Sequence, residues 1–161
     1  MEKILEIIEN ESKGPPSTTS TGVLGVGIRV GTDKILYDII FTGRRLIAAA
    51  IFSQSEISRL GPVFGLQNVG LAIRWKKMMQ ERRAEREGKT PEEILQLHKE
   101  NYEIPYKTIK AYKVKKGLLN AQVQFEVDRE GKRRKITVPI PKKRAEQVRQ
   151  LLATNVPGSV G

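Results

Sequence analysis

A strict alternation of apolar and polar side chains runs through residues 119–128, and it constrains the fold more than any other stretch. The apolar members are Leu119, Ala121, Val123, Phe125 and Val127. The polar members between them are Asn120, Gln122, Gln124, Glu126 and Asp128. Because successive side chains leave opposite faces of a pleated strand, this period of two predicts a strand with one buried face.

The flanking residues predict partner strands and a closing helix. Residues 128–131 indicate a turn, since Gly131 can adopt the positive φ that hairpins need. Strands are expected on either side, over residues 109–115 and around the alternating set Ile136, Val138 and Ile140. Pro141 has no N–H for a ladder and suits the first turn of a helix. An apolar stripe then predicts a helix to about residue 155, formed by Ala145, Val148, Leu151 and Leu152.

The first half of the chain predicts further strands. Residues 1–12 favour a short amphipathic helix, and residues 14–22, rich in Pro, Ser and Thr, a flexible linker. Three apolar runs follow at 23–30, 34–41 and 45–52. Their short breaks require antiparallel neighbours, because parallel strands need a long crossover. Asp38 lies within the second run, and we expect it to pair with an arginine of a neighbouring strand.

Two helices are expected between these strands and the later ones. Residues 66–87 predict a long helix that begins apolar and becomes charged all round, so that its second half projects from the body. Thr90-Pro91-Glu92-Glu93 is a capping box with proline at the first helical position, and its helix is expected to end near Tyr102. Trp75 in the first helix fits either a core position or a membrane interface.

Two short motifs resemble those of a known family. Residues 42–47 (TGRRLI) and 104–109 (IPYKTI) are similar to the T-x-x-R-L-I and I-P-Y-x-x-I motifs of pleckstrin-homology-like (PH-like) domains of bacteria and archaea. The resemblance covers residues 23–52 and 104–153. It implies a domain over 23–155, with a helical insertion at about 66–102, an N-terminal segment 1–22 and a flexible tail 156–161.

The fold that this resemblance implies is α+β. It is a strongly bent antiparallel sheet or partly open barrel of about six or seven strands, capped by a C-terminal helix. The resemblance also implies binding or scaffolding without catalysis. The first hairpin turn is Gly31-Thr32-Asp33, and it lacks the basic motif with which eukaryotic members recognise inositol phosphates. Specific recognition of that headgroup is therefore not implied.

The positive charge of the chain is concentrated in one region. Residues 104–144 contain thirteen Lys and Arg against three acidic residues, a net +10 of the total +11. Such a surface favours polyanions, although basic side chains also serve solubility and protect strand edges. The candidate binding residues are Lys113, Lys115, Lys116, Arg129, Lys132, Arg133, Arg134, Lys135, Lys142, Lys143 and Arg144. A second basic patch comprises Arg74, Lys76, Lys77, Arg82 and Arg83.

Two kinds of partner fit this surface. The favoured hypothesis is an adaptor that engages a protein partner or an anionic lipid surface, with self-association through the N-terminal or inserted helices also open. The alternative is a nucleic-acid-binding protein that uses the same surface. Single-strand binders stack bases on aromatic side chains, and the basic strands offer only Tyr106 and Tyr112 for this.

No catalytic constellation is evident. The chain has no cysteine and a single histidine, His98, without a carboxylate four residues before it, and no metal-ligand spacing occurs. We therefore expect no enzyme, no metal and no cofactor. The absence of cysteine fits a cytoplasmic protein, and the longest apolar runs are too short to span a bilayer, which leaves peripheral membrane association open.

Overall fold

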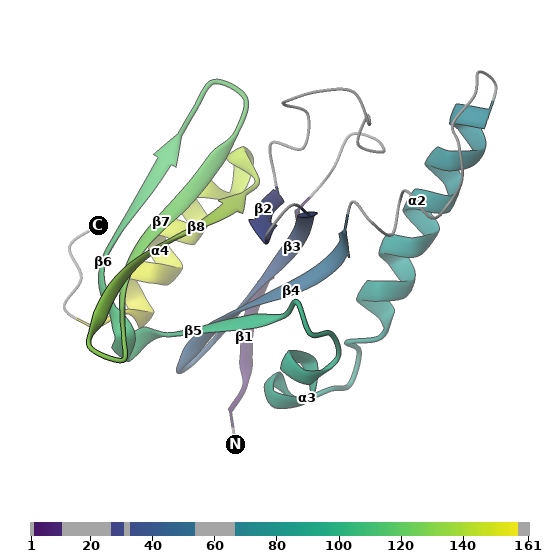
Figure 1. Cartoon of the computed structure of the whole chain (residues 1–161). Helices are drawn as coiled ribbons and strands as arrows, with labels where there is room; N and C mark the ends of the chain where they lie inside the picture. The colour runs from purple at the N-terminus through teal and green to yellow at the C-terminus, as the bar shows by residue number, and fades with distance from the viewer. Residues whose placement is uncertain (1, 11–26, 31–32, 54–66, 158–161) are drawn as a thin grey trace.

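The protein is an α+β fold of two antiparallel sheets with a C-terminal helix (Figure 1). The computed structural model describes residues 2–10, 27–30, 33–53 and 67–157. The first sheet contains β1 (Ile4–Ile8), β2 (Gly27–Val30), β3 (Asp33–Thr42), β4 (Arg45–Ser53) and β5 (Tyr102–Pro105). The second contains β6 (Ile109–Lys116), β7 (Ala121–Arg129) and β8 (Lys132–Ile140). The helices are α2 (Gln67–Ala84), α3 (Pro91–Gln96) and α4 (Ala145–Asn155), with short 3-10 turns η1 (Tyr106–Thr108) and η2 (Lys142–Arg144).

In the first sheet, β1, β3, β4 and β5 are neighbours in that order. β2 also pairs with β3, through Asp33 to Leu36, whereas β1 pairs with β3 at residues 39–42. The helix expected for residues 1–12 is therefore wrong where the structure describes them, because residues 4–8 form the strand β1. An isolated helix of this length is marginal in water, whereas an isoleucine-rich segment gains hydrogen bonds and packing by pairing with β3.

The second sheet confirms the alternation in β7. Ala121, Val123, Phe125 and Val127 are buried, and the residues between them are half-buried. The β7–β8 turn has positive φ at both central residues, Glu130 (55°) and Gly131 (74°), as a two-residue hairpin of primed type requires. The chain crosses from the first sheet to the second through β5, η1 and β6.

Both sheets and α4 share one core. It includes Phe41 of β3, Phe125 of β7, and Val148 and Leu152 of α4, all at most 1% exposed. Hydrogen-bonded pairing among the described strands leaves the two sheets separate and closes no barrel. A side chain nevertheless joins them, since Asn10 Nδ2 donates to the carbonyl of Tyr37 in β3 (2.6 Å) and to that of Pro139 in β8 (3.1 Å).

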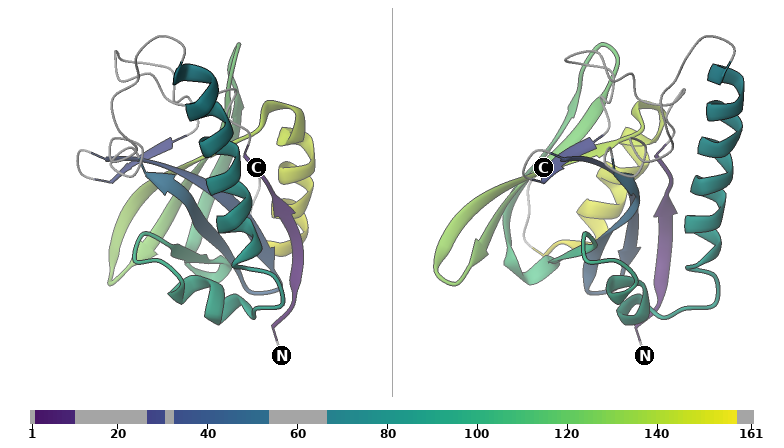
Figure 2. Two further views of the ribbon diagram at one scale, coloured as in Figure 1. Left: turned by 90° about the vertical axis from the view of Figure 1, so that its right-hand side faces the viewer. Right: turned by 45° about the vertical axis from the view of Figure 1, so that its right-hand side comes forward.

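The helical insertion lies between β4 and β5, as expected. Of the described side chains of α2, Met79 near its C-terminal end is buried, whereas Ile73 in its first half is 64% exposed. The charged end of the helix therefore packs on the sheet and does not project as expected, whereas most apolar side chains of its first half lie outside the described ones. In Figure 2 (right), α2 stands beside the first sheet and its N-terminal end extends upward.

The second inserted helix is shorter than expected. The capping box is present: Glu93 N–H donates to Thr90 Oγ1 (3.2 Å), and Thr90 N–H donates to Glu93 Oε2 (2.7 Å). Asn101 explains why the helix stops well before Tyr102. Its Nδ2 donates to the carbonyl of Ile94 (2.8 Å) and its Oδ1 accepts from Ala50 N–H in β4 (2.8 Å), so the chain is already docked on the sheet.

The expected linker at 14–22 and the first hairpin turn at 31–32 lie outside the described residues. So do the last four residues of the expected tail. Val156, assigned to that tail, is 3% exposed and belongs to the core, so the ordered domain reaches beyond residue 155.

Candidate anion-binding surface

The strand register divides the basic residues of the second sheet between its two faces. Lys113 and Lys115 pair with Gln124 and Gln122, and so lie on the face opposite the buried side chains of β7. On β8, Arg133 and Lys135 share this outer face, since they pair with Asp128 and Glu126. The other candidate binding residues on these strands leave the opposite side: Lys116, Arg129, Lys132 and Arg134. The candidate binding residues on these strands are therefore divided between the two faces of the sheet.

Charge differs between the two ends of the sheet. Near the β7–β8 turn, the five basic residues (Arg129 and 132–135) lie close to three acidic ones: Arg133 pairs with Asp128, Lys135 pairs with Glu126, and Glu130 is in the turn itself. Toward the other end of the sheet, the paired segments 112–124 and 136–145 contain no acidic residue. We call that end, at the top of the second sheet in Figure 1, the acid-free end. Its exposed basic residues are Lys113, Lys115, Lys116, Lys142 and Lys143.

Several of the predicted binding residues have partners within the fold, among them Lys142, Arg144 and Arg129. Lys142 Nζ donates to the carbonyl of Leu118 (2.7 Å), which ties η2 to the β6–β7 turn. Arg144 Nη2 lies 3.4 Å from Glu6 Oε1 of β1, and Arg129 Nη2 donates to the carbonyl of Glu103 in β5 (2.7 Å). Arg129 and Arg144 thus connect the two ends of the second-sheet region to the first sheet.

The second basic patch is not a single surface. Arg74, Lys76 and Lys77 are exposed on α2, and Arg82 is half-buried. Arg83 instead faces the first sheet, where its Nε lies 2.8 Å from Asp38 Oδ2. This outcome removes Arg83 from the candidate surface residues.

Asp38 is fully buried at the centre of a polar cluster. It accepts from Arg83, from Arg86 Nη2 (3.0 Å) and from the backbone N–H of Asn10 (3.0 Å). Sequence reasoning expected an arginine of a neighbouring strand, but the arginines come from α2 and the turn after it. A buried carboxylate requires such partners, because an unpaired charge in the interior is strongly unfavourable. The cluster fixes the C-terminal end of α2 on the sheet.

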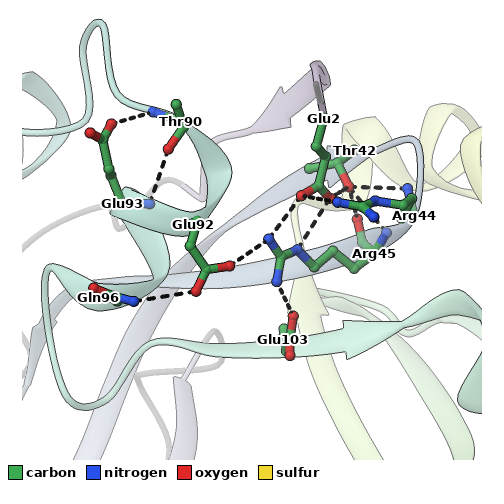
Figure 3. A network of polar contacts seen from close by, with 9 residues as sticks. All are labelled: Glu2, Thr42, Arg44, Arg45, Thr90, Glu92, Glu93, Gln96 and Glu103. Carbon is green, nitrogen blue, oxygen red and sulfur yellow. Dashed lines mark hydrogen bonds and ion pairs between the residues drawn. The ribbon is translucent and has the colours of Figure 1, made fainter.

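A second cluster, absent from the sequence-based expectations, surrounds Arg45 at the start of β4 (Figure 3). Its guanidinium lies between three carboxylates from separate segments. Arg45 Nε and Nη2 donate to Glu2 Oε1 (3.1 Å) and Oε2 (2.8 Å), Nη2 also to Glu92 Oε2 of α3 (3.0 Å), and Nη1 to Glu103 of β5. Burial opposes the charge of Arg45, but hydrogen bonds to the three carboxylates outweigh it and raise the pKa of the guanidinium.

Glu2 is the most enclosed of the three carboxylates. Its side chain is 7% exposed, whereas those of Glu103 and Glu92 are 36% and 59% exposed. Burial alone would raise its pKa, but the hydroxyl of Thr42, at 2.5 Å from Oε1, and the guanidinium of Arg45 together lower it. The cluster holds the N-terminal segment, α3 and β5 against the β3–β4 turn.

A cleft of about 490 Å³ opens beside this cluster. It is lined by Gly43, Arg44, Arg45, Glu92, Glu103, Pro105, Tyr106, Lys107, Asn155 and Pro157. Arg45 is occupied by its carboxylates, which leaves Arg44 and Lys107 as the exposed cations of the cleft. The sequence alone does not indicate that these residues lie together, because they come from segments up to about a hundred residues apart.

The two motifs behind the family resemblance contact each other at this cleft. Tyr106 donates its N–H to the carbonyl of Arg44 (3.0 Å) and its hydroxyl to the carbonyl of Thr42 (2.8 Å). Burial raises the pKa of the Tyr106 hydroxyl. The start of the second motif is thus fixed on the turn that carries the first.

The described residues contain no group of three or more His, Asp and Glu side chains that could hold a metal ion. His98 is partly exposed, and its Nε2 lies 2.9 Å from Glu85 Oε2, which connects the segment after α3 to the turn after α2. None of the helices within residues 67–157 is long and apolar enough to cross a membrane. Comparison of the chain with protein-family models, with curated proteins and with solved structures found no match.

Proposed function

We propose that the chain is a non-catalytic binding domain of the PH-like type that attaches to an anionic membrane surface. The observation that carries this proposal is the acid-free end of the second sheet. Its lysines are exposed and come from β6 and η2, and no acidic residue interrupts either segment. A cationic surface near anionic headgroups gains about 1 kcal/mol per Lys or Arg.

The topology supports the PH-like part of the proposal. Strands β3, β4 and β5, then β6, β7 and β8, and finally α4 follow one another in the order that the resemblance implies. The corner at η1 and the contact of Asn10 with both sheets support a partly open barrel. The direct contact of the two motifs through Tyr106 points the same way.

The aromatic residues favour a membrane over single-stranded nucleic acid. The aromatic residues of this region, Tyr106 of η1, Tyr112 of β6 and Phe125 of β7, are 3%, 5% and 0% exposed and belong to the core. They cannot stack on bases without unfolding the sheet, and stacking supplies much of the affinity of single-strand binders. Binding to nucleic acid through phosphates alone is one outcome of the test below.

The test uses two variants that remove equal charge from the two ends of the second sheet. The first combines Lys113→Gln, Lys115→Gln and Lys116→Gln at the acid-free end. The matched control combines Arg133→Gln, Arg134→Gln and Lys135→Gln near the β7–β8 turn. All six side chains are exposed, so both variants should fold.

Co-sedimentation is measured with vesicles of phosphatidylcholine, with and without phosphatidylserine. We expect wild-type protein to bind only the anionic vesicles, less so at higher salt. The first variant should lose this binding and the control should retain most of it. Binding to DNA or RNA but not to vesicles would contradict the proposal, as would equal losses in both variants. Absence of binding to either would shift the assignment to a protein partner.

A further inference from the structure

The β6–β7 turn carries two adjacent leucines that the fold does not cover. Leu118 is 89% exposed and Leu119 is 83% exposed. A single exposed leucine is ordinary, but neighbouring leucines at the end of a hairpin form a small apolar tip. The turn does not require them, since Gly117 and Asn120 supply its geometry. Gly117 N–H donates to the carbonyl of Asn120 (2.7 Å), and a Cβ on Gly117 would lie 3.1 Å from that oxygen.

Some of the backbone polar groups of this tip have hydrogen-bond partners within the protein. The carbonyl of Leu118 accepts from Lys142 Nζ, and the N–H of Gly117 is used in the turn. This matters because an unpaired backbone group costs several kcal/mol in the hydrocarbon of a bilayer. A tip that enters the headgroup boundary therefore leaves fewer polar groups without partners than an open loop would.

Basic side chains surround the base of the tip. Lys115 and Lys116 are consecutive in β6, so they leave opposite faces of the hairpin, and Lys142 approaches from η2. Lysine can bury its methylene stem against apolar atoms while its ammonium stays at the polar boundary. The geometry points to a hairpin tip, Leu118-Leu119, that inserts into the interfacial region of an anionic bilayer while these lysines contact the headgroups.

This inference rests on the proposed function, because it assigns that function a point of insertion and an orientation. The charge around the leucines favours an anionic lipid surface over a second copy of this basic chain. If two copies met through their acid-free ends, their lysines would repel one another, because these segments contain no acidic residue to pair with them.

The absence of cysteine allows single-site labelling. An environment-sensitive fluorophore on Leu119→Cys reports on the tip, and the same fluorophore on Ala153→Cys, an exposed position of α4, is the control. With phosphatidylserine vesicles, we expect a blue shift and brighter emission at position 119 and no change at position 153. Emission at position 119 that stays as in water, while the protein co-sediments, would refute insertion and leave the proposed function standing.

A pair of substitutions supplies a second readout. Leu118→Ser with Leu119→Ser removes the tip, and Ile73→Ser, at a position 64% exposed on α2, is the control. We expect the double variant to bind anionic vesicles at least tenfold more weakly, with its far-UV circular dichroism and its dependence on salt unchanged. Wild-type affinity in the double variant would overturn the inference. A fluorescence change that depends on protein concentration in the absence of lipid would overturn the inference in favour of self-association. Failure of the wild-type protein to bind vesicles would contradict the proposed function itself.

Discussion

Replacement of Arg45 by methionine should destabilise the protein by about 2–3 kcal/mol. The substitution keeps much of the side-chain volume but leaves Glu2, whose side chain is 7% exposed, without its two hydrogen bonds from the guanidinium. Hydrogen bonds to charged groups contribute roughly 1.5–3 kcal/mol, and breaking a fully buried pair costs about 3–5 kcal/mol. The pair with Glu92, which is 59% exposed, adds little. Because Thr42 still donates a hydrogen bond to Glu2, we expect a loss of stability in the lower part of the range of about 1.5–5 kcal/mol that these two estimates span.

The assay is urea denaturation followed by far-UV circular dichroism, with thermal melts alongside. A loss of this size lowers the melting temperature of a chain of this length by roughly 5–10 °C. Arg44→Met is the matched control, because Arg44 has a 77% exposed side chain and lies 3.6 Å from Glu2. It should change the free energy of unfolding by less than about 0.5 kcal/mol. Equal stability of the two variants would refute the assigned role of Arg45.

The same cluster predicts a dependence of stability on pH. The folded protein holds the pKa of Glu2 below its ordinary value of 4.5, so this carboxylate stabilises the fold above that pH. The contribution is lost as the pH falls through the lowered pKa of the folded state. In Arg45→Met, burial of Glu2 is opposed by fewer partners, so the loss of stability attributable to Glu2 below about pH 4.5 should be smaller. The same dependence of stability on pH in both proteins below about pH 4.5 would contradict this account.

Two further substitutions test other parts of the fold. Asp38→Asn should lower the free energy of unfolding by about 3 kcal/mol, because Arg83 and Arg86 lose the buried negative charge between them. An unaltered urea midpoint would argue against this role of Asp38. Gly131→Ala should cost about 1 kcal/mol, since φ is +74° there and the surrounding space is open. The control is Gly43→Ala, because a Cβ at Gly43 meets no atom within 4 Å and its φ is not in the left-handed region. Equal losses of stability in the two variants would exclude backbone strain as the cause.

The second sheet could be predicted from local sequence because its signals are local. Alternation in β7, glycine in the β7–β8 turn and Pro141 before α4 each act within a few residues. The error at residues 4–8 has a different origin. Ile4, Ile7 and Ile8 fit one face of a helix as well as a strand, and the edge of β3, about thirty residues away in sequence, decides between them. Likewise, the docking of α2 depends on Asp38, which periodicity within the helix cannot reveal.

The candidate site was predictable as a concentration of charge but not as a surface. Counting lysines located the region, whereas the register of β6, β7 and β8 decides that Lys113 and Lys116 leave different faces. Local reading also assigned Leu119 to the apolar face of β7, although the strand begins at Ala121 and Leu119 is exposed in the turn. The Arg45 cluster joins four separate segments, and only the fold brings these together.

The most direct test of membrane attachment is the ratio of partition coefficients between the two triple-glutamine variants on anionic vesicles. Three lysines at about 1 kcal/mol each correspond to roughly a hundredfold difference in affinity. We predict that the variant at Lys113, Lys115 and Lys116 binds about a hundredfold more weakly than the variant at Arg133, Arg134 and Lys135. Equal partition coefficients would show that only net charge matters and would contradict a binding surface at the acid-free end.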